Sequence, residues 1–285
     1  MAARPAPPEP LPLPVADNHT HLDLARQGEV PVPVSEAIAA AERVNVTRLV
    51  QIGCSLDSAR WTVRAVREYP QLLGGVALHP TEAVQVVASA ADPAAGARAL
   101  DEALAEIEAL AADPRIRVVG ETGLDYHWTP PGQGREVQRE SFARHIALAK
   151  KLGKVLQIHD RDAHADVLDV LAAEGAPERT VFHCFSGDAE LARFCADRGW
   201  YLSFAGNVTF RNAEGLREAV RAVPADRVLV ETDAPYLAPA PYRGRTNASS
   251  LVPVIVRQLA ELLGLGVRDT CVRLDATMAE LYGPW

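Results

Sequence analysis

The feature that most constrains this chain is a regular alternation of short, apolar, β-branched runs with longer segments of helical periodicity. The pattern begins near residue 13 and continues almost to the end of the chain. Apolar runs of this length and composition predict strands. The eight predicted strands are Leu13–Asp17, Arg48–Gly53, Gly75–His79, Ile116–Glu121, Val155–His159, Thr180–Cys184, Tyr201–Gly206 and Val228–Asp233.

Helical periodicity fills the intervals between the strands and continues after the last one. The predicted helices are Ser35–Arg43, Asp57–Glu68, Ala97–Ala111, Gln138–Leu152, Ala163–Ala173, Ala189–Arg198, Ala213–Val223, Ser249–Leu263 and Arg268–Leu281. Strands that alternate with helices indicate βαβ units with parallel pairing. The apolar character of the strands indicates that both of their faces are buried.

Two architectures satisfy this alternation, a closed (β/α)8 barrel and an open doubly wound sheet. A barrel gathers the carboxyl ends of all its strands at one mouth, whereas an open sheet uses a single crevice. Nearly every predicted strand ends in or is followed by a residue that can act in catalysis or bind a metal. These residues are Asp17, His19, His21, His79, Glu121, His159, His183 and Asp233. Because one barrel mouth could gather all of them, we predict a protein of the α/β class with a (β/α)8 TIM barrel.

The domain organisation is predicted to be simple. The chain has 285 residues, which is enough to bury the core of one barrel, and we expect a single domain over residues 15–285. Residues 1–14 contain six prolines and predict an extended, flexible tail. The alanine-rich segment 86–98 is interpreted as a surface insertion before a helix.

Composition narrows the class of protein further. The net charge of −8 argues against wrapping a long stretch of nucleic acid, because that affinity comes mostly from neutralised phosphates. The four cysteines lack a C-x-x-C spacing, so neither a cysteine zinc site nor a disulfide framework is indicated. The longest apolar stretches are shorter than the ~20 residues of a membrane helix. We expect a cytoplasmic protein without membrane contact or a stable protein partner.

The segment Asp17-Asn18-His19-Thr20-His21 is the first candidate site. Alternate side chains of an extended segment point the same way, so Asp17, His19 and His21 are predicted to share one face. Two imidazoles on one face can chelate a divalent ion. By itself the H-x-H spacing is weak evidence, since histidines also cluster on surfaces by chance.

The other strand ends strengthen the metal interpretation. A lone histidine or carboxylate at such a place could cap a turn or sit satisfied in the core, but four histidines and two carboxylates on five strand ends are hard to explain structurally. Six ligands exceed one zinc site and suit two ions with a bridging carboxylate, for which Glu121 is placed in the middle of the strand order. Histidine-rich ligation favours zinc, manganese, iron or nickel over magnesium. The predicted ligands are His19, His21, Glu121, His159, His183 and Asp233.

From Asp17 to about Tyr282 the chain resembles the TatD family of metal-dependent deoxyribonucleases, within the amidohydrolase-like barrel superfamily. The order of six segments carries this resemblance. They are DNHTHLD (17–23), GETGLDYHW (120–128), IHDRDA (158–163), HCFSG (183–187), ETDAPYL (231–237) and PYRGRTN (241–247). The resemblance implies the same six ligands, with Glu121 bridging two ions and Asp233 beside the attacking water, from which it could take a proton.

The resemblance also implies the activity, a magnesium-dependent 3′–5′ exonuclease that acts on DNA. Because the histidine-rich ligands favour softer metals than magnesium, we expect two divalent cations that could be Mg²⁺, Mn²⁺ or Zn²⁺. Asp233 and Glu121 would then be catalytic, and single strands or 3′ ends would be the substrate. His79, in a histidine-proline pair, matches a family position near the substrate phosphate. Arg161 and Arg243 are predicted phosphate clamps, because guanidinium groups match phosphate geometry, although surface salt bridges are the alternative. Tyr126, His127 and Trp128 could stack on a base or simply form a packed loop.

The sequence leaves two other functions open. A barrel of this kind could hydrolyse an ester or amide instead, as a D-aminoacyl-tRNA deacylase does. A barrel that binds without catalysis is the remaining alternative, and the six filled ligand positions argue against it. His145 and His164 fall within helical patterns and are interpreted as ordinary helix residues.

Overall fold

The computed structural model describes residues 5–26 and 28–285. Over these residues eight strands alternate with ten α-helices, and three short 3₁₀ turns complete the order. The strands are β1 Val15–Thr20, β2 Val46–Gly53, β3 Leu72–Val76, β4 Ile116–Asp125, β5 Val155–Arg161, β6 Thr180–Phe182, β7 Tyr201–Phe204 and β8 Val228–Val230. The helices are α1 Val34–Glu42, α2 Leu56–Glu68, α3 Pro80–Ala88, α4 Pro93–Ala111, α5 Gln133–Leu152, α6 His164–Glu174, α7 Ala189–Asp197, α8 Glu214–Arg221, α9 Val252–Leu263 and α10 Val267–Tyr282.

The strands form one sheet in the order of the chain, β1 to β8. The pairs β1–β2, β3–β4, β4–β5, β5–β6 and β7–β8 are all parallel. A parallel bridge between Thr20 and Ala234 joins the end of β1 to the segment after β8. A doubly wound sheet reverses its strand order at a switch point, whereas a barrel keeps chain order and returns to the first strand. The predicted (β/α)8 barrel is therefore confirmed.

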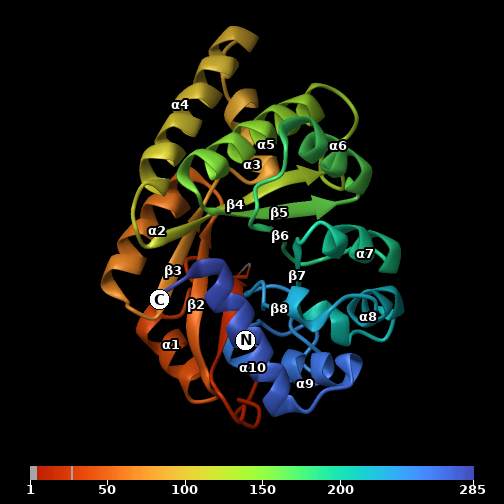
Figure 1. The fold of residues 1–285 in the computed structure, drawn as a ribbon. Helices are drawn as coiled ribbons and strands as arrows, with labels where there is room; N and C mark the ends of the chain where they lie inside the picture. Colours follow the sequence, from red (N-terminus) through yellow and green to blue (C-terminus); the bar gives the residue numbers. More distant parts are fainter. Residues whose placement is uncertain (1–4, 27) are drawn as a thin grey trace. The chain divides into compact units, whose positions relative to one another are not determined.

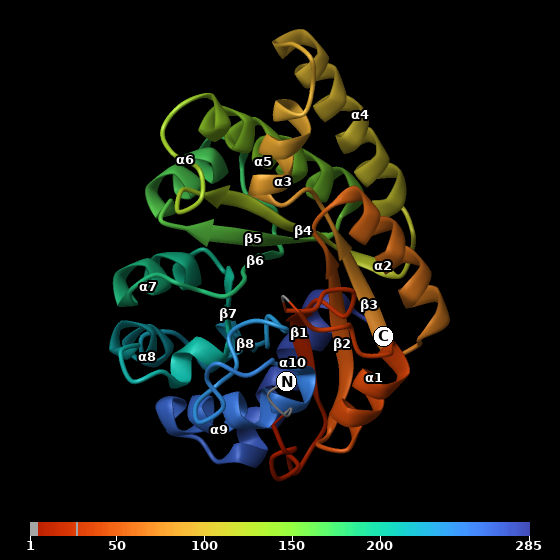
Figure 2. The same ribbon diagram turned by 180° about the vertical axis from the view of Figure 1, so that it is seen from behind.

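Two compact units divide the chain. The first unit contains the described residues up to Gln51, the short segment Pro70–Leu72 and Cys184–Trp285. Its strand β1 is completely buried, and α10 packs beside β1 and β8 (Figure 2). On β1, the amide of Asn18 donates to Ser203 Oγ at 3.0 Å and accepts from the hydroxyl of Tyr282 at 2.5 Å.

The second unit contains Ile52–Tyr69 and Leu73–His183. Its helices α5 and α6 pack against β4 and β5 (Figure 1). Helix α2 begins at Ser55, whose side chain accepts the backbone N–H of Ser58, as a helix N-cap does. The pairing of β4 with β5 extends to Asp125 and Arg161, so both strands run several residues past the point at which β6 ends. The extended ends of β4 and β5 therefore carry the polar residues Glu121, Asp125, His159 and Arg161.

The segment after β3 differs from the prediction. Strand β3 ends at Val76, so His79 does not end the strand, and it is the N-cap of α3 instead. Much of the segment 86–98, interpreted as a surface insertion, is helical, because α3 continues to Ala88 and α4 begins at Pro93; its being an insertion stays a prediction. Both helices have a proline in their first turn, where its missing N–H costs nothing.

The N-terminal segment makes contacts within the first unit. The first four residues of the predicted flexible tail, residues 1–14, lie outside the described residues. Within the described part, Leu11 is buried and donates its N–H to Val44 O at 3.2 Å, and Arg257 donates to the carbonyl of Glu9 at 2.9 Å. The flexibility of the tail and the single domain over 15–285 stay predictions.

In the described part of the chain, no single helix combines the length and the apolar character needed to cross a bilayer. One bent pair, Ser249–Leu263 with Val267–Tyr282, passes on length and composition alone, with a bend of 103° between its members.

Candidate functional site

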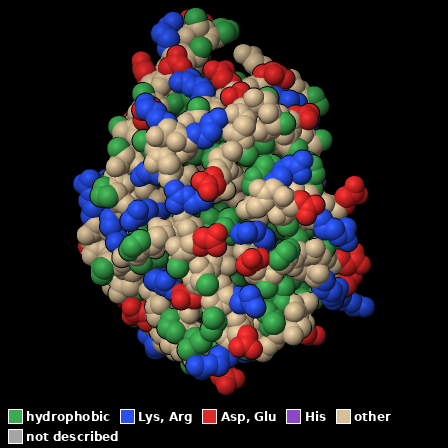
Figure 3. All heavy atoms as spheres, in the orientation of Figure 1, with side chains coloured by type: hydrophobic (Ala, Val, Ile, Leu, Met, Phe, Trp, Pro, Cys, Tyr) green, Lys and Arg blue, Asp and Glu red, His purple; other side chains and the backbone are tan. Residues whose placement is uncertain are grey.

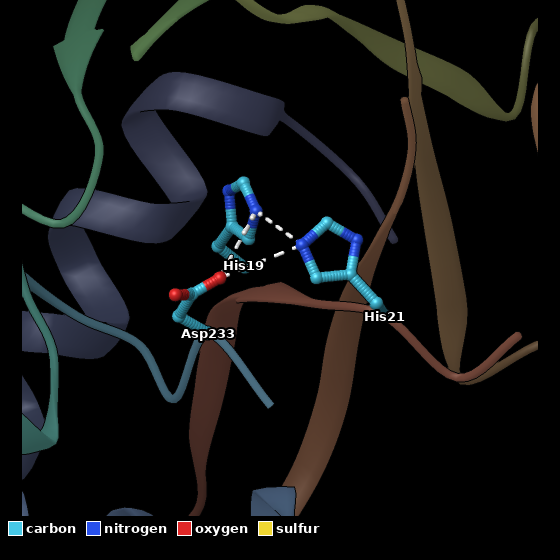
Figure 4. A group of neighbouring side chains, drawn as sticks. All are labelled: His19, His21 and Asp233. Carbon is cyan, nitrogen blue, oxygen red and sulfur yellow. Dashed lines mark hydrogen bonds and ion pairs between the residues drawn. The ribbon is translucent and has the colours of Figure 1, made fainter. Parts of the chain in front are cut away.

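The first unit carries a cluster of His19, His21 and Asp233, which we call the β1 cluster (Figure 4). The two Nε2 atoms lie 3.2 Å apart, and Asp233 Oδ1 lies 3.9 Å from His19 Nε2 and 3.5 Å from His21 Nε2. Zinc–nitrogen bonds of about 2.0–2.1 Å in a tetrahedral site place two nitrogens about 3.3 Å apart. The three converging donor atoms therefore fit a divalent cation.

Backbone and side-chain hydrogen bonds fix the β1 cluster in place. His21 donates its N–H to Ala234 O at 2.8 Å, and Asp233 donates its N–H to His19 O at 3.0 Å. Asp17 lies beneath them and accepts from the Thr232 N–H at 2.9 Å and from the Thr232 hydroxyl at 2.6 Å. Burial raises the pKa of Asp17 to about 7, although these hydrogen bonds oppose the shift. Asp17 thus ties the strand of the histidines to the segment of Asp233.

The second unit carries a cluster of Glu121, His159 and His183, which we call the β4 cluster. Glu121 Oε2 lies 2.6 Å from His183 Nε2 and 3.0 Å from His159 Nδ1, and the two ring nitrogens are 3.5 Å apart. The thiol of Cys54 donates to the other oxygen, Glu121 Oε1, at 3.1 Å. These nitrogen and oxygen donors again converge on one point, as a divalent cation requires.

The electrostatics of the β4 cluster favour an ionised carboxylate. Burial alone would raise the pKa of Glu121, but the charge of His183 and the hydrogen bonds from His159 and His183 hold it well below its usual range. An ionised carboxylate between two imidazoles is the form that binds a cation.

His79 lies next to this cluster, and its ring centre is 4.5 Å from that of His159. With Glu121 and His159 it forms another group whose ligand atoms lie within 4.8 Å of one another. Its Nδ1 accepts the N–H of Thr81 at 3.2 Å, as the N-cap of α3. Desolvation, together with the positive charge of His159, lowers the pKa of His79 to about 3. The neutral ring therefore carries its proton on Nε2 and acts as a donor.

The two predicted phosphate clamps, Arg161 and Arg243, each lie against an aromatic side chain. The guanidinium of Arg161 lies 5.8 Å from the ring centre of Trp128, and that of Arg243 lies 4.6 Å from the ring centre of Phe210. Arg161, Arg243 and Trp128 are exposed. The structure thus places both arginines where a ligand could reach them, each supported by a cation–π contact.

A cavity of about 410 Å³ opens beside the β1 cluster within the first unit. His21 and Thr20 form part of its wall, and α1 contributes Ala37 and Ala40. Most of the lining is apolar, with Arg43 and Asn247 among the polar exceptions. Cavities of this size and character commonly hold small organic groups.

Sequence reasoning missed three residues in or near the surroundings of the β4 cluster: Cys54, Asp125 and His145. Asp125 is four residues after Glu121 on β4, so strand alternation placed both on one face and could have indicated it. His145, interpreted as an ordinary helix residue, accepts the N–H of Leu78 at its Nε2 over 3.2 Å and so holds the segment that carries His79. No local signal pointed to that contact, because its partners are 67 residues apart.

Comparisons with known proteins identify the family and the fold. The model of a family described as TatD related DNase matches residues 16–283. A Mycobacterium tuberculosis (strain ATCC 25618 / H37Rv) protein named "Uncharacterized metal-dependent hydrolase TatD" is 45% identical over 262 residues, covering 91% of this chain and 93% of that protein. The solved structure of YJJV, a TatD homolog from Escherichia coli K12, has a TM-score of 0.81 at 20% identity and covers 95% of this chain and 98% of that chain.

The barrel, the histidine–carboxylate clusters and these similarities together define a metal-dependent hydrolase. Within that class, the chain belongs to the TatD-related DNase family. The family resemblance predicted from the six sequence segments is confirmed.

Proposed function

We propose that this protein is a 3′–5′ exodeoxyribonuclease that hydrolyses phosphodiester bonds of DNA with two divalent cations. The observation that carries the proposal is the pair of convergent donor clusters in a chain that matches the TatD-related DNase family. His19, His21 and Asp233 would hold one cation, and Glu121, His159 and His183 the other. The cation is Mg²⁺, Mn²⁺ or Zn²⁺. A bridging role of Glu121 stays a prediction from the resemblance.

Cations bound in these clusters would neutralise charge on the scissile phosphate and make the attacking water more acidic. Asp233 is proposed to take the proton of that water. Its side chain is 15% exposed, so a water molecule can reach the carboxylate. A carboxylate within hydrogen-bond reach of the nucleophile is the geometry that general-base catalysis requires. Glu121, held ionised by His183 and His159, is proposed to keep its cation in place through the reaction.

His79 is proposed to position the phosphate. Thr81 occupies its Nδ1, so the neutral ring presents Nε2–H, which can donate to a phosphate oxygen. Arg161 and Arg243 are proposed to contact flanking phosphates. The exposed Trp128 beside Arg161 offers a face on which a base can stack, a contact that single-stranded substrates allow and duplexes do not.

The charge distribution supports attack on strand ends rather than on long duplexes. On the face drawn in Figure 3, arginine and lysine side chains are interspersed with aspartate and glutamate. With a net charge of −8, such a surface offers little general attraction for a polyanion. A terminal nucleotide presents few phosphates, and bound cations would supply local positive charge. Single strands and 3′ ends are therefore the proposed substrates.

The cavity beside His21 is proposed to receive the base of the terminal nucleotide. Its apolar lining matches the faces of a base, and Arg43 and Asn247 can serve polar edges. A reducing compartment, the cytoplasm, is proposed for the protein. The four cysteines all fall within the described residues, and none of them forms a disulfide there. We propose no stable protein partner.

The test uses metal-stripped protein with single-stranded DNA labelled at its 3′ or its 5′ end. Mg²⁺, Mn²⁺ and Zn²⁺ are added back separately. We expect metal-dependent shortening from the 3′ end, lost in Glu121→Ala and in Asp233→Asn. Asp162→Asn is the matched control, because this exposed carboxylate pairs with His127, which belongs to neither cluster.

Each other outcome points to a different function. Protein that binds two ions but shortens no DNA would shift the assignment to ester or amide hydrolysis, and release of a D-amino acid from aminoacyl-tRNA would be assayed next. Cleavage that survives Glu121→Ala in a clean preparation would contradict the assigned site. Protein that binds no metal at all would leave a barrel that binds without catalysis.

A further inference from the structure

Asp125 is the last residue of β4 and is 1% exposed. Its Oδ1 accepts the N–H of Trp128 at 2.9 Å, and its own N–H donates to Gln138 Oε1 at 3.0 Å. Gln138 in turn donates to the hydroxyl of Thr129 at 2.8 Å. The carboxylate is therefore fixed by its backbone and by one of its oxygens before any ligand binds.

The second oxygen of Asp125 faces a residue of the β4 cluster. Asp125 Oδ2 lies 3.0 Å from Nε2 of His159, whereas Nδ1 of the same ring faces Glu121 Oε2 at 3.0 Å. A neutral imidazole has one N–H and one lone pair, and an ionised carboxylate can only accept a proton. A cation held by Glu121 would take the place of the hydrogen on Nδ1, and with Asp125 as acceptor the remaining hydrogen stays on Nε2.

We propose that Asp125 is the positioning residue of the β4 cluster: its carboxylate accepts the Nε2–H of His159, so that the ring offers Nδ1 to a cation held with Glu121 and His183. The inference rests on the ligand role of His159 in the proposed function. Carboxylates that orient metal-bound histidines act in this way, and their loss typically costs about 10- to 100-fold in metal affinity.

Asp125→Asn is the informative variant, because it keeps the size of the side chain and an oxygen for the Trp128 N–H. Its amide group would face Nε2 as a donor, which favours the tautomer with the proton on Nδ1. We expect the affinity of the β4 cluster for Zn²⁺ to fall about 10- to 100-fold. The readout is a Zn²⁺ titration followed by ¹⁵N-histidine NMR, in which His159 reports the β4 cluster and His19 reports the β1 cluster.

Three features make this experiment decisive. The His19 resonances should titrate as in the wild type, which shows that the variant is folded. Asp162→Asn, a carboxylate beside the non-ligand His127, should leave both clusters unchanged. In the zinc-loaded wild type, the spectrum should show a proton on His159 Nε2, and this measurement needs no variant at all.

Zinc affinity of Asp125→Asn within about twofold of the wild type would overturn the proposal. A wild-type spectrum with the proton on Nδ1, or a β4 cluster that binds no zinc, would overturn it too. None of these readouts involves DNA. A protein that binds zinc through Nδ1 yet cleaves no DNA would therefore contradict the nuclease assignment and leave the role of Asp125 supported.

Discussion

At the scale of single residues, the neighbours of each histidine decide what that histidine can do. His79 and His145 both lie near the β4 cluster, and each has one nitrogen committed to a backbone N–H, from Thr81 and Leu78 respectively. His145 also directs its Nδ1 to Ser141 O at 2.7 Å, so Nδ1 is the donor. A buried ring that must accept at one nitrogen works only when it is neutral.

This requirement makes His145 a source of acid sensitivity. Burial lowers its pKa to about 4 in the folded protein, against about 6.5 when unfolded. Because the folded state resists protonation, its stability is complete above pH 6.5 and is lost as the pH falls toward 4. The loss is about 1.4 kcal/mol per pH unit, or about 3 kcal/mol over this window.

We therefore expect the unfolding free energy of the wild type to fall more steeply below pH 6.5 than that of His145→Gln. Glutamine can still accept the Leu78 N–H but does not titrate. Urea unfolding at pH 7.5, 6 and 5 measures the difference. Parallel pH curves for the two proteins would refute the assignment.

At the scale of elements, the close approach of β4 and β5 depends on a glycine. Gly123 pairs with His159 and has a φ of +141°, and a Cβ there would lie 2.1 Å from His159 O. Any side chain at this position would push the backbone of a proposed metal ligand away from β4. The segment Gly120 to Asp125 thus supplies the carboxylates of Glu121 and Asp125 and the space that their partner strand requires.

Gly123→Ala should therefore cost both stability and metal binding. Gly132→Ala is the matched control, since Gly132 has a similar φ of +137° but no atom within 4 Å of the added Cβ. We expect a loss on the order of 1–3 kcal/mol for the control, from backbone strain alone, and a larger loss for Gly123→Ala with weaker Zn²⁺ binding at the β4 cluster. Urea midpoints and zinc titration measure both effects. Equal midpoints for the two variants would contradict the steric argument.

At the scale of the whole molecule, each cluster joins residues that are distant in the chain. The β1 cluster unites residues 19 and 21 with residue 233, and the β4 cluster unites residues 121, 159 and 183. Unfolding separates Asp233 from the two histidines and disperses the β4 donors, so we expect a cation to bind the folded protein more tightly than the unfolded chain. Binding energy at each cluster then adds to the stability of the fold.

Removal of metal should accordingly lower the thermal midpoint. A free metal concentration of about 100 times the dissociation constant adds about 2.7 kcal/mol per site. We expect EDTA to lower the midpoint of the wild type by several degrees, and His21→Ala to lose part of this metal-dependent gain. Differential scanning calorimetry with and without Zn²⁺ provides the measurement. An equal thermal midpoint of the wild type with and without Zn²⁺ would contradict the assignment of both clusters as cation sites.

The cavity beside His21 makes a prediction about the substrate. Ala40 lines it from α1, so Ala40→Phe should obstruct the proposed base site and raise the KM for single-stranded DNA about tenfold, at 1.4 kcal/mol of lost binding. Ser35→Phe adds the same ring at an exposed position of α1 that does not line the cavity. Steady-state kinetics compares them. An equal KM in both variants would remove the cavity from the substrate site.

The sequence by itself determined the alternation of strands and helices, the family, and the residues of the two clusters, because strand periodicity and ligand chemistry are local properties. Residues His19, His21 and Asp233 lie together as that reasoning predicts, and so do Glu121, His159 and His183. Sequence reasoning misplaced the end of β3 and did not predict α3. The apolar run continues past Val76 to His79, so the N-cap of α3 is predicted as the end of the strand.

Only the tertiary structure decided which nitrogen of each histidine is available. The contact of Asp125 with His159, that of His145 with Leu78, and that of Asp17 with Thr232 join residues 34, 67 and 215 positions apart. Hydrogen-bond direction depends on the atom that packing places opposite each ring or carboxylate. Packing brings together residues distant in the chain, so their partners emerge only when the strands pair and the helices cover them.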